Sequence, residues 1–138
     1  MPELAELKFT ADYINEVSTD ATYFEVEKNP QHKCEDLNIP FKHFKISAES
    51  RGKELVLVAK DQDSDEFVPI RMTMGMSGYF KLTETSQELK HSHLKFKTTH
   101  GTTLSFVDVR RFGKWKQGLW WSENRGPDPT TNPRDFFL

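Results

Sequence analysis

The chain has 138 residues with a formal net charge of −2 at pH 7, and 36% of its residues are hydrophobic. This length is enough for one domain with a hydrophobic core but short for two. The sequence contains no apolar run that could span a membrane and no signal peptide, and its single cysteine, Cys34, excludes an internal disulfide and zinc sites that need several cysteines. We therefore expect an intracellular, monomeric protein with no metal and no cofactor.

The charges are distributed unevenly along the chain. Residues 1–69 hold 8 Lys and Arg against 15 Asp and Glu, a net charge of −7, whereas residues 70–138 hold 11 against 6, a net charge of +5. A domain with one basic side is compatible with phosphate binding. An uneven solvated surface would give the same counts, so the charge leaves nucleic acid open as a partner without requiring it.

The first six residues, Met-Pro-Glu-Leu-Ala-Glu, carry candidate catalytic groups. Removal of the initiator Met1 would leave Pro2 with a free secondary amine. An α-amine titrates roughly 2.5 units below a lysine, so more of it is neutral and nucleophilic at pH 7. Glu3 and Glu6 are three apart and share one face of a helix, where they could act as acid or base. Taken alone, the same residues are typical of an ordinary helix start, with Pro in the first turn and acids at its positive end.

The hydrophobic pattern predicts one helix followed by strands. Apolar residues recur at helical spacing from Leu4 to Val17, which predicts a helix over residues 3–18. The period then changes to two, and strands are predicted within residues 24–27, 44–49, 55–58, 70–74, 80–82, 93–97 and 104–108. In the strand at 93–97, Leu94 and Phe96 face the core while His93 faces outward with its lysine neighbours. We predict a mainly β fold: an N-terminal helix and a two-layer antiparallel β-sandwich of about eight strands.

The amino-acid composition changes at Gly126. Residues 126–133 are rich in Gly and Pro and read as a linker. Asp135 and the apolar residues after it look like the first turn of a further helix. We expect a domain at residues 1–125 and an interdomain linker at 126–138, although a tail that folds back on the sandwich is the alternative.

Four short motifs occur in order along the chain: Met-Pro-Glu-Leu-Ala-Glu at 1–6, Arg-Gly-Lys-Glu-Leu at 51–55, Gly-Met-Ser-Gly at 75–78 and Asp-Val-Arg-Arg-Phe-Gly at 108–113. Together they resemble the N-terminal domain of the formamidopyrimidine-DNA glycosylase / endonuclease VIII family. The residues around the second and fourth motifs are most similar to the eukaryotic endonuclease VIII-like enzymes. The resemblance implies base-excision repair of oxidised bases in double-stranded DNA, in the nucleus if the source is eukaryotic.

The resemblance also implies catalytic roles. Pro2 would attack C1′ of the damaged nucleotide and form an iminium, Glu3 would act as general acid, and Glu6 would assist. Lys53 matches the family lysine near the lesion phosphate; without the other motifs it would be interpreted as a surface lysine at a strand end.

A further group matches the residues with which the family fills the gap left by a flipped-out base. These are Met76, Arg110 and Phe112. Arg111, and less directly His93, would hold phosphates. Core packing is the alternative for Met76 and Phe112, but Met76 stands between glycines in a turn, where a core residue is unusual.

Two departures from the family pattern leave rival hypotheses open. Ala5 stands where the family usually has Pro, and the C-terminal helix–two-turn–helix domain that grips the other side of the DNA has no counterpart in these residues. A retained Met1 would also block the Pro2 amine. The rivals are a non-catalytic DNA-binding module of the same fold and an N-terminal-proline tautomerase. The tautomerase is disfavoured because such enzymes place the proline at the start of a strand.

Overall fold

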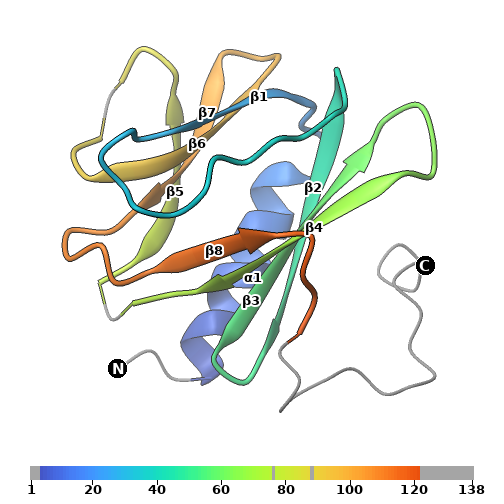
Figure 1. The fold of residues 1–138 in the computed structure, drawn as a ribbon. Coiled ribbons are helices and arrows are strands. Elements are labelled where there is room, and N and C mark those ends of the chain that lie inside the picture. Colours follow the sequence, from blue (N-terminus) through green and yellow to red (C-terminus); the bar gives the residue numbers. More distant parts are fainter. Residues whose placement is uncertain (1–3, 76, 88, 122–138) are drawn as a thin grey trace.

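The computed structural model describes residues 4–75, 77–87 and 89–121, with side chains from Leu7 onward. This part of the chain contains one helix, α1 (Leu4–Ser18), and eight strands (Figure 1). The strands are β1 (Tyr23–Lys28), β2 (Phe44–Arg51), β3 (Glu54–Asp61), β4 (Phe67–Thr73), β5 (Tyr79–Glu84), β6 (Ser92–Thr98), β7 (Thr102–Val107) and β8 (Lys114–Gln117). The predicted linker at 126–138 lies outside the described residues.

The eight strands are hydrogen-bonded in the order β5-β7-β6-β1-β2-β3-β4-β8, and the described pairs are antiparallel. β1 and β2 are paired only where Tyr23 meets Phe44, whereas the other neighbours pair along most of their length. The sheet therefore folds at this narrow junction into two four-stranded layers, as Figure 1 shows. The predicted helix and antiparallel β-sandwich are confirmed.

The inner faces of the two layers form one hydrophobic core. Phe96 and Phe106 from one layer and Phe44 and Ile70 from the other are almost completely buried. The ring of Phe106 meets that of Trp115 on β8 edge to face, with 6.2 Å between the ring centroids. Each such side chain contributes roughly 1.5–3 kcal/mol when it leaves water, so the alternating strand pattern holds the layers together.

Helix α1 closes one side of the sandwich by bonding to the backbone of two strands. The side-chain amide of Asn15 donates to the carbonyl oxygen of Ala48 at 2.9 Å and accepts from the Ala48 N–H at 2.8 Å. The Tyr13 hydroxyl accepts a hydrogen bond from the backbone N–H of Leu82 on β5 at 3.0 Å. The helix thus replaces a missing strand neighbour for β2 and also covers β5 at the edge of the other layer.

Strand β3 is buried on both faces, as its unbroken apolar run predicts. Leu55 and Leu57 belong to the main core, whereas Val56 and Val58 pack under Trp121, which follows β8. The guanidinium of Arg51 lies 4.9 Å from the centre of a Trp121 ring. The residues after β8, up to Trp121, therefore cover the outer face of the layer formed by β2, β3, β4 and β8.

Irregular strand pairing breaks the alternation of side-chain directions at two places. The register of β1 against β6 shifts between Tyr23 and Glu25, and Phe24 is left 46% exposed. The register of β6 against β7 shifts between Ser92 and Leu94, and His93 is only 1% exposed. The prediction that His93 faces outward is therefore wrong, because a bulge breaks the alternation at that point.

No helix within the described residues is long and apolar enough to cross a membrane.

Candidate nucleic-acid interface

Strand register brings three of the four sequence motifs to one end of the sandwich. Glu54 pairs with Thr73, and Thr73 pairs with Lys114 on its other side. These three residues form one row across the sheet. Each is next to a motif in the chain: the β2–β3 turn with Lys53, the loop at residues 75–78, and the end of the loop at residues 108–113. α1 begins towards this end too, since its last residue, Ser18, bonds Tyr23 at the opposite end.

The loop at residues 108–113 presents polar and apolar side chains to solvent. Arg110 and Arg111 are exposed, and Phe112 is 61% exposed. Arg111 has a φ of 58°, in the left-handed region that L-residues seldom occupy. Its guanidinium donates to the Gln31 side chain at 3.3 Å. The loop therefore offers an exposed aromatic ring beside two guanidinium groups.

Asp108 begins this loop and is completely buried. Its carboxylate accepts from the Ser77 hydroxyl at 2.5 Å, the Gly113 N–H at 2.7 Å and the Arg110 N–H at 3.3 Å. Burial alone raises the pKa of the carboxyl, but these three donors outweigh it and hold the pKa of Asp108 below its ordinary value of 3.8. Asp108 therefore carries a full negative charge at neutral pH.

The loop at 75–78 lies directly against the loop at 108–113. A Cβ placed on Gly75 would be 2.8 Å from the Cβ of Phe112, and one on Gly113 would be 2.5 Å from the ring of Phe106. Both positions need glycine, because a side chain on Gly75 would collide with Phe112 and one on Gly113 with the buried ring of Phe106. Close packing therefore accounts for the glycine that begins the first motif and the glycine that ends the second.

An open pocket of about 430 Å³ lies between the β1–β2 loop and the 108–113 loop. We call it the basic pocket, since four cationic side chains line it together with Gln31, His32, Cys34 and Phe112; they are Lys33, Arg110, Arg111 and Lys114. Its chemistry suits a polyanion with an apolar or aromatic part.

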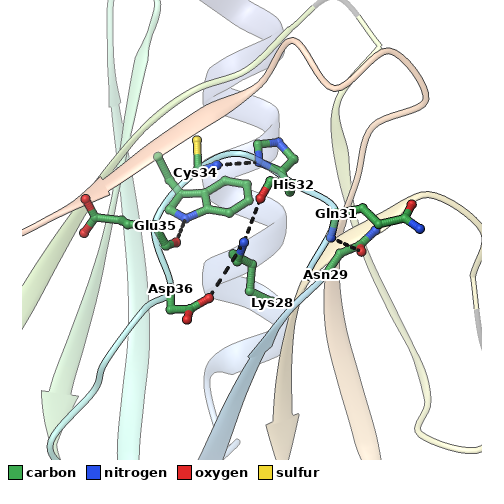
Figure 2. A network of polar contacts seen from close by, with 8 residues as sticks. Lys28, Asn29, Gln31, His32, Cys34, Glu35 and Asp36 are labelled. Atoms are coloured by element: carbon green, nitrogen blue, oxygen red, sulfur yellow. Dashed lines mark hydrogen bonds and ion pairs between the residues drawn. The ribbon is translucent and has the colours of Figure 1, made fainter.

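The wall of the basic pocket is fixed by the β1–β2 loop, shown in Figure 2. Lys28 donates to the carbonyl oxygen of His32 at 2.7 Å and forms an ion pair with Asp36 at 3.7 Å. The indole N–H of Trp115 donates to the carbonyl oxygen of Glu35 at 2.8 Å. These contacts tie the loop to β1 and β8 and hold Lys33 at the rim.

His32 forms the buried foot of this loop. Its ring lies 4.3 Å from that of Trp115 and 4.9 Å from that of His93, measured between centroids. Its Nδ1 accepts the Cys34 N–H at 3.1 Å, so the tautomer with the proton on Nε2 is favoured. Burial, and then the nearby His93, lowers the pKa of His32 below its ordinary value of 6.5.

The structure brings together some of the predicted site residues and leaves others undescribed. Lys53 is exposed in the β2–β3 turn, and Arg110, Arg111 and Phe112 share one loop. His93 lies behind that loop, where its Nε2 bonds the Asp108 carbonyl oxygen at 2.7 Å. Pro2, Glu3 and Met76 lie outside the described residues, and Glu6 belongs to α1 with a side chain that is not described.

Sequence reasoning assigned no role to several residues of this end. Asp108 belongs to the motif at residues 108–113. Its position as an acid just before two arginines, in the basic half of the chain, is a signal in the sequence that could have pointed to it. No signal in the sequence points to Lys33, Lys114 or His32, because only the fold brings residues 31–34 close to residues 110–114. No three His, Cys, Asp or Glu side chains in the described part of the chain are grouped to hold a metal.

Comparison with known proteins identifies the family. The model of the formamidopyrimidine-DNA glycosylase N-terminal domain matches residues 1–115. The chain belongs to the formamidopyrimidine-DNA glycosylase family. This confirms the resemblance carried by the motifs, and the family consists of DNA glycosylases of base-excision repair.

Curated relatives are longer than this chain. Endonuclease 8-like 1 from Homo sapiens is 34% identical over 135 residues, which cover 92% of this chain and 35% of the human protein. Formamidopyrimidine-DNA glycosylase from Pseudomonas paraeruginosa is 29% identical over 147 residues, which cover 96% of this chain and 51% of the bacterial protein. The chain thus spans a third to a half of the length of these relatives.

Solved structures share the fold. MutM in complex with DNA that contains carbocyclic 8-oxo-G has a TM-score of 0.69 and 23% identity, over 84% of this chain and 43% of MutM. A complex of the LlFpg protein with a THF-DNA and an inhibitor has a TM-score of 0.68 at the same identity and covers 43% of that protein. The eight-stranded sandwich with its leading helix is therefore the N-terminal fold of this family.

Proposed function

We propose that this chain is the catalytic N-terminal part of a bifunctional DNA glycosylase/AP lyase that excises oxidised bases from duplex DNA. The observation that carries the proposal is the 108–113 loop, which presents Arg110, Arg111 and Phe112 to solvent beside the basic pocket. An exposed aromatic wedge among cations is what a protein needs to enter a base stack and hold phosphates at the same time.

The proposed chemistry begins at the Pro2 amine. Its nitrogen forms a bond to C1′ of the damaged nucleotide while the bond from C1′ to the base breaks, and the base leaves with a proton from Glu3. The C1′–O4′ bond then breaks and the proton on the Pro2 nitrogen passes to O4′, which leaves an iminium and makes the neighbouring C2′–H acidic. Loss of that proton, with Glu6 as a candidate acceptor, expels the 3′ phosphate and cuts the strand.

The loops at residues 75–78 and 108–113 would help to expose C1′. A base must leave the stack before its sugar can be attacked, and the gap must be filled. We assign Phe112 and Met76 as wedges and Arg110 as the partner of the orphaned base, because guanidinium N–H groups can bond base edges. Lys53, Arg111, Lys33 and Lys114 would hold phosphates. The buried His93 would act through Asp108 rather than by touching a phosphate.

A second domain is part of this proposal. The relatives extend well beyond the matched region, and the resemblance implies a helix–two-turn–helix domain that grips the far side of the DNA. One sandwich end offers few phosphate contacts, so this chain alone would turn over slowly. Such an enzyme would work as a monomer in the compartment that holds the DNA.

Borohydride trapping tests the chemistry. Duplex DNA with an abasic site, mixed with the protein and borohydride, should give a covalent complex when intact mass shows that Met1 is absent. The matched control is the same protein with an N-acetylated Met1 retained, in which the Pro2 nitrogen is an amide, no α-amine is free and no complex should form. Trapping by a protein with a blocked N-terminus would remove Pro2 from the mechanism, and duplex binding without trapping would favour the non-catalytic module.

A further inference from the structure

The two loops at the candidate interface share one buried charge. Asp108, at 0% exposure, receives the Ser77 hydroxyl from the 75–78 loop and the Gly113 N–H from the 108–113 loop. The carboxylate is therefore a direct link between two loops that are thirty residues apart in sequence. Charge-assisted hydrogen bonds of this kind are about twice as strong as neutral ones.

The backbone of Asp108 is held as firmly as its side chain. Its N–H donates to the carbonyl oxygen of His91 at 3.0 Å, and its carbonyl oxygen pairs with Nε2 of His93 at 2.7 Å. The His93 carbonyl oxygen in turn accepts the Asn29 N–H at 2.9 Å. The carboxylate thus stands at a position set by β6 and the end of β1, so both loops are located relative to the sandwich.

Each loop also bonds within itself. Gly78 donates to the Gly75 carbonyl oxygen at 3.2 Å, and Arg111 donates to the Asp108 carbonyl oxygen at 3.3 Å. These local turns give each loop a shape, but the Ser77–Asp108 bond and the close contact of Gly75 with Phe112 fix one loop against the other. Asp108 is at the centre of this arrangement and makes no contact with solvent.

We propose that Asp108 is a positioning residue that locks the 75–78 loop to the 108–113 loop, so that both enter the DNA as one rigid unit. The inference deepens the proposed function and rests on it for the DNA part. Pre-organised loops enter a base stack without an ordering cost at the moment of binding. Loops that moved separately would reach phosphates equally well but would insert poorly.

The substitution Asp108→Asn removes the charge and replaces one acceptor oxygen with a donor. Three donors face the Asp108 carboxylate, so an amide NH₂ must confront at least one of them. Ser77→Ala is the milder variant, because it removes only the donor on one loop and leaves Gly113 with its acceptor. Ser18→Ala is the matched control, since it also removes a buried hydroxyl bond, to Tyr23, at the other end of the sandwich.

Amide hydrogen exchange tests the lock without DNA. In Asp108→Asn we expect exchange at the Gly113 N–H to rise about tenfold or more, and exchange at the Gly78 N–H, in the other loop, to rise with it. Ser77→Ala should raise exchange at Gly78 and, to a smaller extent, at Gly113, whereas Ser18→Ala should change neither. A purely local role for Asp108 would leave Gly78 unchanged in both loop variants, and that result would overturn the proposal.

Insertion is measured with 2-aminopurine placed opposite a stable abasic-site analogue in the duplex. The parent chain should raise the fluorescence as it unstacks that base. Both loop variants should lose most of this rise at saturating protein. Their binding to undamaged duplex at low salt should weaken by less than about threefold. A double variant, Ser77→Ala with Asp108→Asn, should be no worse than Asp108→Asn alone. Full fluorescence in a variant with lost amide protection would overturn the role in insertion.

The two proposals fail in different ways. If the parent chain gives no fluorescence rise but the amide results are as expected, the lock is upheld and the DNA function is rejected. If Asp108→Asn does not fold, the Ser77→Ala results decide alone, because this variant deletes one oxygen and leaves the buried charge with two donors.

Discussion

The side chain of His32 couples the basic pocket to the pH of the solution. Its pKa in the folded chain lies below the ordinary value of 6.5, chiefly through burial and then through His93, with Lys28 and Arg111 acting in the same direction and a hydrogen bond to the Gly113 backbone opposing them. Below pH 6.5 the unfolded chain therefore binds a proton that the folded chain does not. The contribution of His32 to the free energy of unfolding therefore falls as the pH drops from about 6.5 towards the folded pKa, and it is regained above 6.5.

We expect His32→Asn to remove this acid sensitivity. An asparagine side chain can still accept the Cys34 N–H but cannot titrate, so the variant should be less stable overall yet show a flatter dependence of stability on pH below about 6.5. Urea unfolding at several pH values measures the slope. His100→Asn, at an exposed loop position, is the control and should keep the parent slope; an unchanged slope in His32→Asn would contradict the assignment.

Single residues were predictable from sequence where a motif fixed their neighbourhood. Arg110 and Phe112 belong to the motif at residues 108–113, which forms a turn that ends in a glycine. Both side chains are exposed there, as the resemblance implied. Lys33 could not be found, because its place beside Lys114 depends on the path of the whole β1–β2 loop. His93 was assigned the wrong face, since a bulge is set by how two strands pair and not by the alternation within one of them.

At the level of elements, helix α1 takes the place of a strand. On the side away from β3, β2 has no strand partner at Ala48, and the Asn15 amide supplies both a donor and an acceptor there. A backbone N–H and C=O left without partners inside the protein would each cost about 1–3 kcal/mol. The Asn15 side chain therefore helps to fix the position of the helix, together with the Tyr13 bond to Leu82 and the buried side chain of Ile14.

We predict that Asn15→Ala lowers the free energy of unfolding by about 1–3 kcal/mol, because Ala48 loses both bonds and water can replace them only in part. Glu16→Ala, on the exposed face of the same helix, is the matched control and should change stability by less than about 0.5 kcal/mol. Urea unfolding followed by circular dichroism measures both. Equal stability of the two variants would show that packing alone holds α1 in place.

Elements were predictable in proportion to the burial of their side chains. The helix and β3 followed from long apolar patterns, and both are confirmed. β8 was not located, because it has four residues of which only Trp115 is buried, and it forms only by pairing with β4. The two-layer arrangement followed from the number of strands, whereas the narrow β1–β2 junction that creates it could not be deduced.

At the scale of the whole molecule, the basic pocket and the acidic hairpin at residues 61–66 lie towards opposite ends of β3. The basic pocket and Lys53 lie towards the end marked by Glu54, and the acidic hairpin at residues 61–66 lies at the end marked by Asp61. An eight-residue strand spans about 23 Å, which is more than two Debye lengths at physiological salt. The acidic end therefore cancels little of the positive potential at the candidate interface, although the net charge is −2.

This separation leads to a prediction for DNA binding by the 138-residue chain. We expect three to five phosphate contacts, to which Lys33, Lys53, Arg111 and Lys114 contribute. Each contact releases condensed counterion with a slope of about −0.9 in log affinity against log salt, so affinity should fall by roughly two to three orders of magnitude between 50 and 200 mM salt. Fluorescence anisotropy with a labelled duplex measures the slope. The joint variant Lys33→Ala with Lys114→Ala should make it shallower by about 1.8.

The control is Lys42→Ala, since this exposed lysine precedes His43, whose carbonyl oxygen accepts the Gln62 N–H at the acidic end. It changes the net charge without touching the proposed interface and should leave the slope unchanged. If Lys42→Ala lowers the slope as much as a pocket lysine does, binding follows overall charge and the DNA does not dock at the basic pocket. If the chain alone binds lesion duplex selectively at nanomolar concentration and 150 mM salt, the sandwich needs no second domain to hold the DNA, and a handful of phosphate contacts would be too few to account for its affinity.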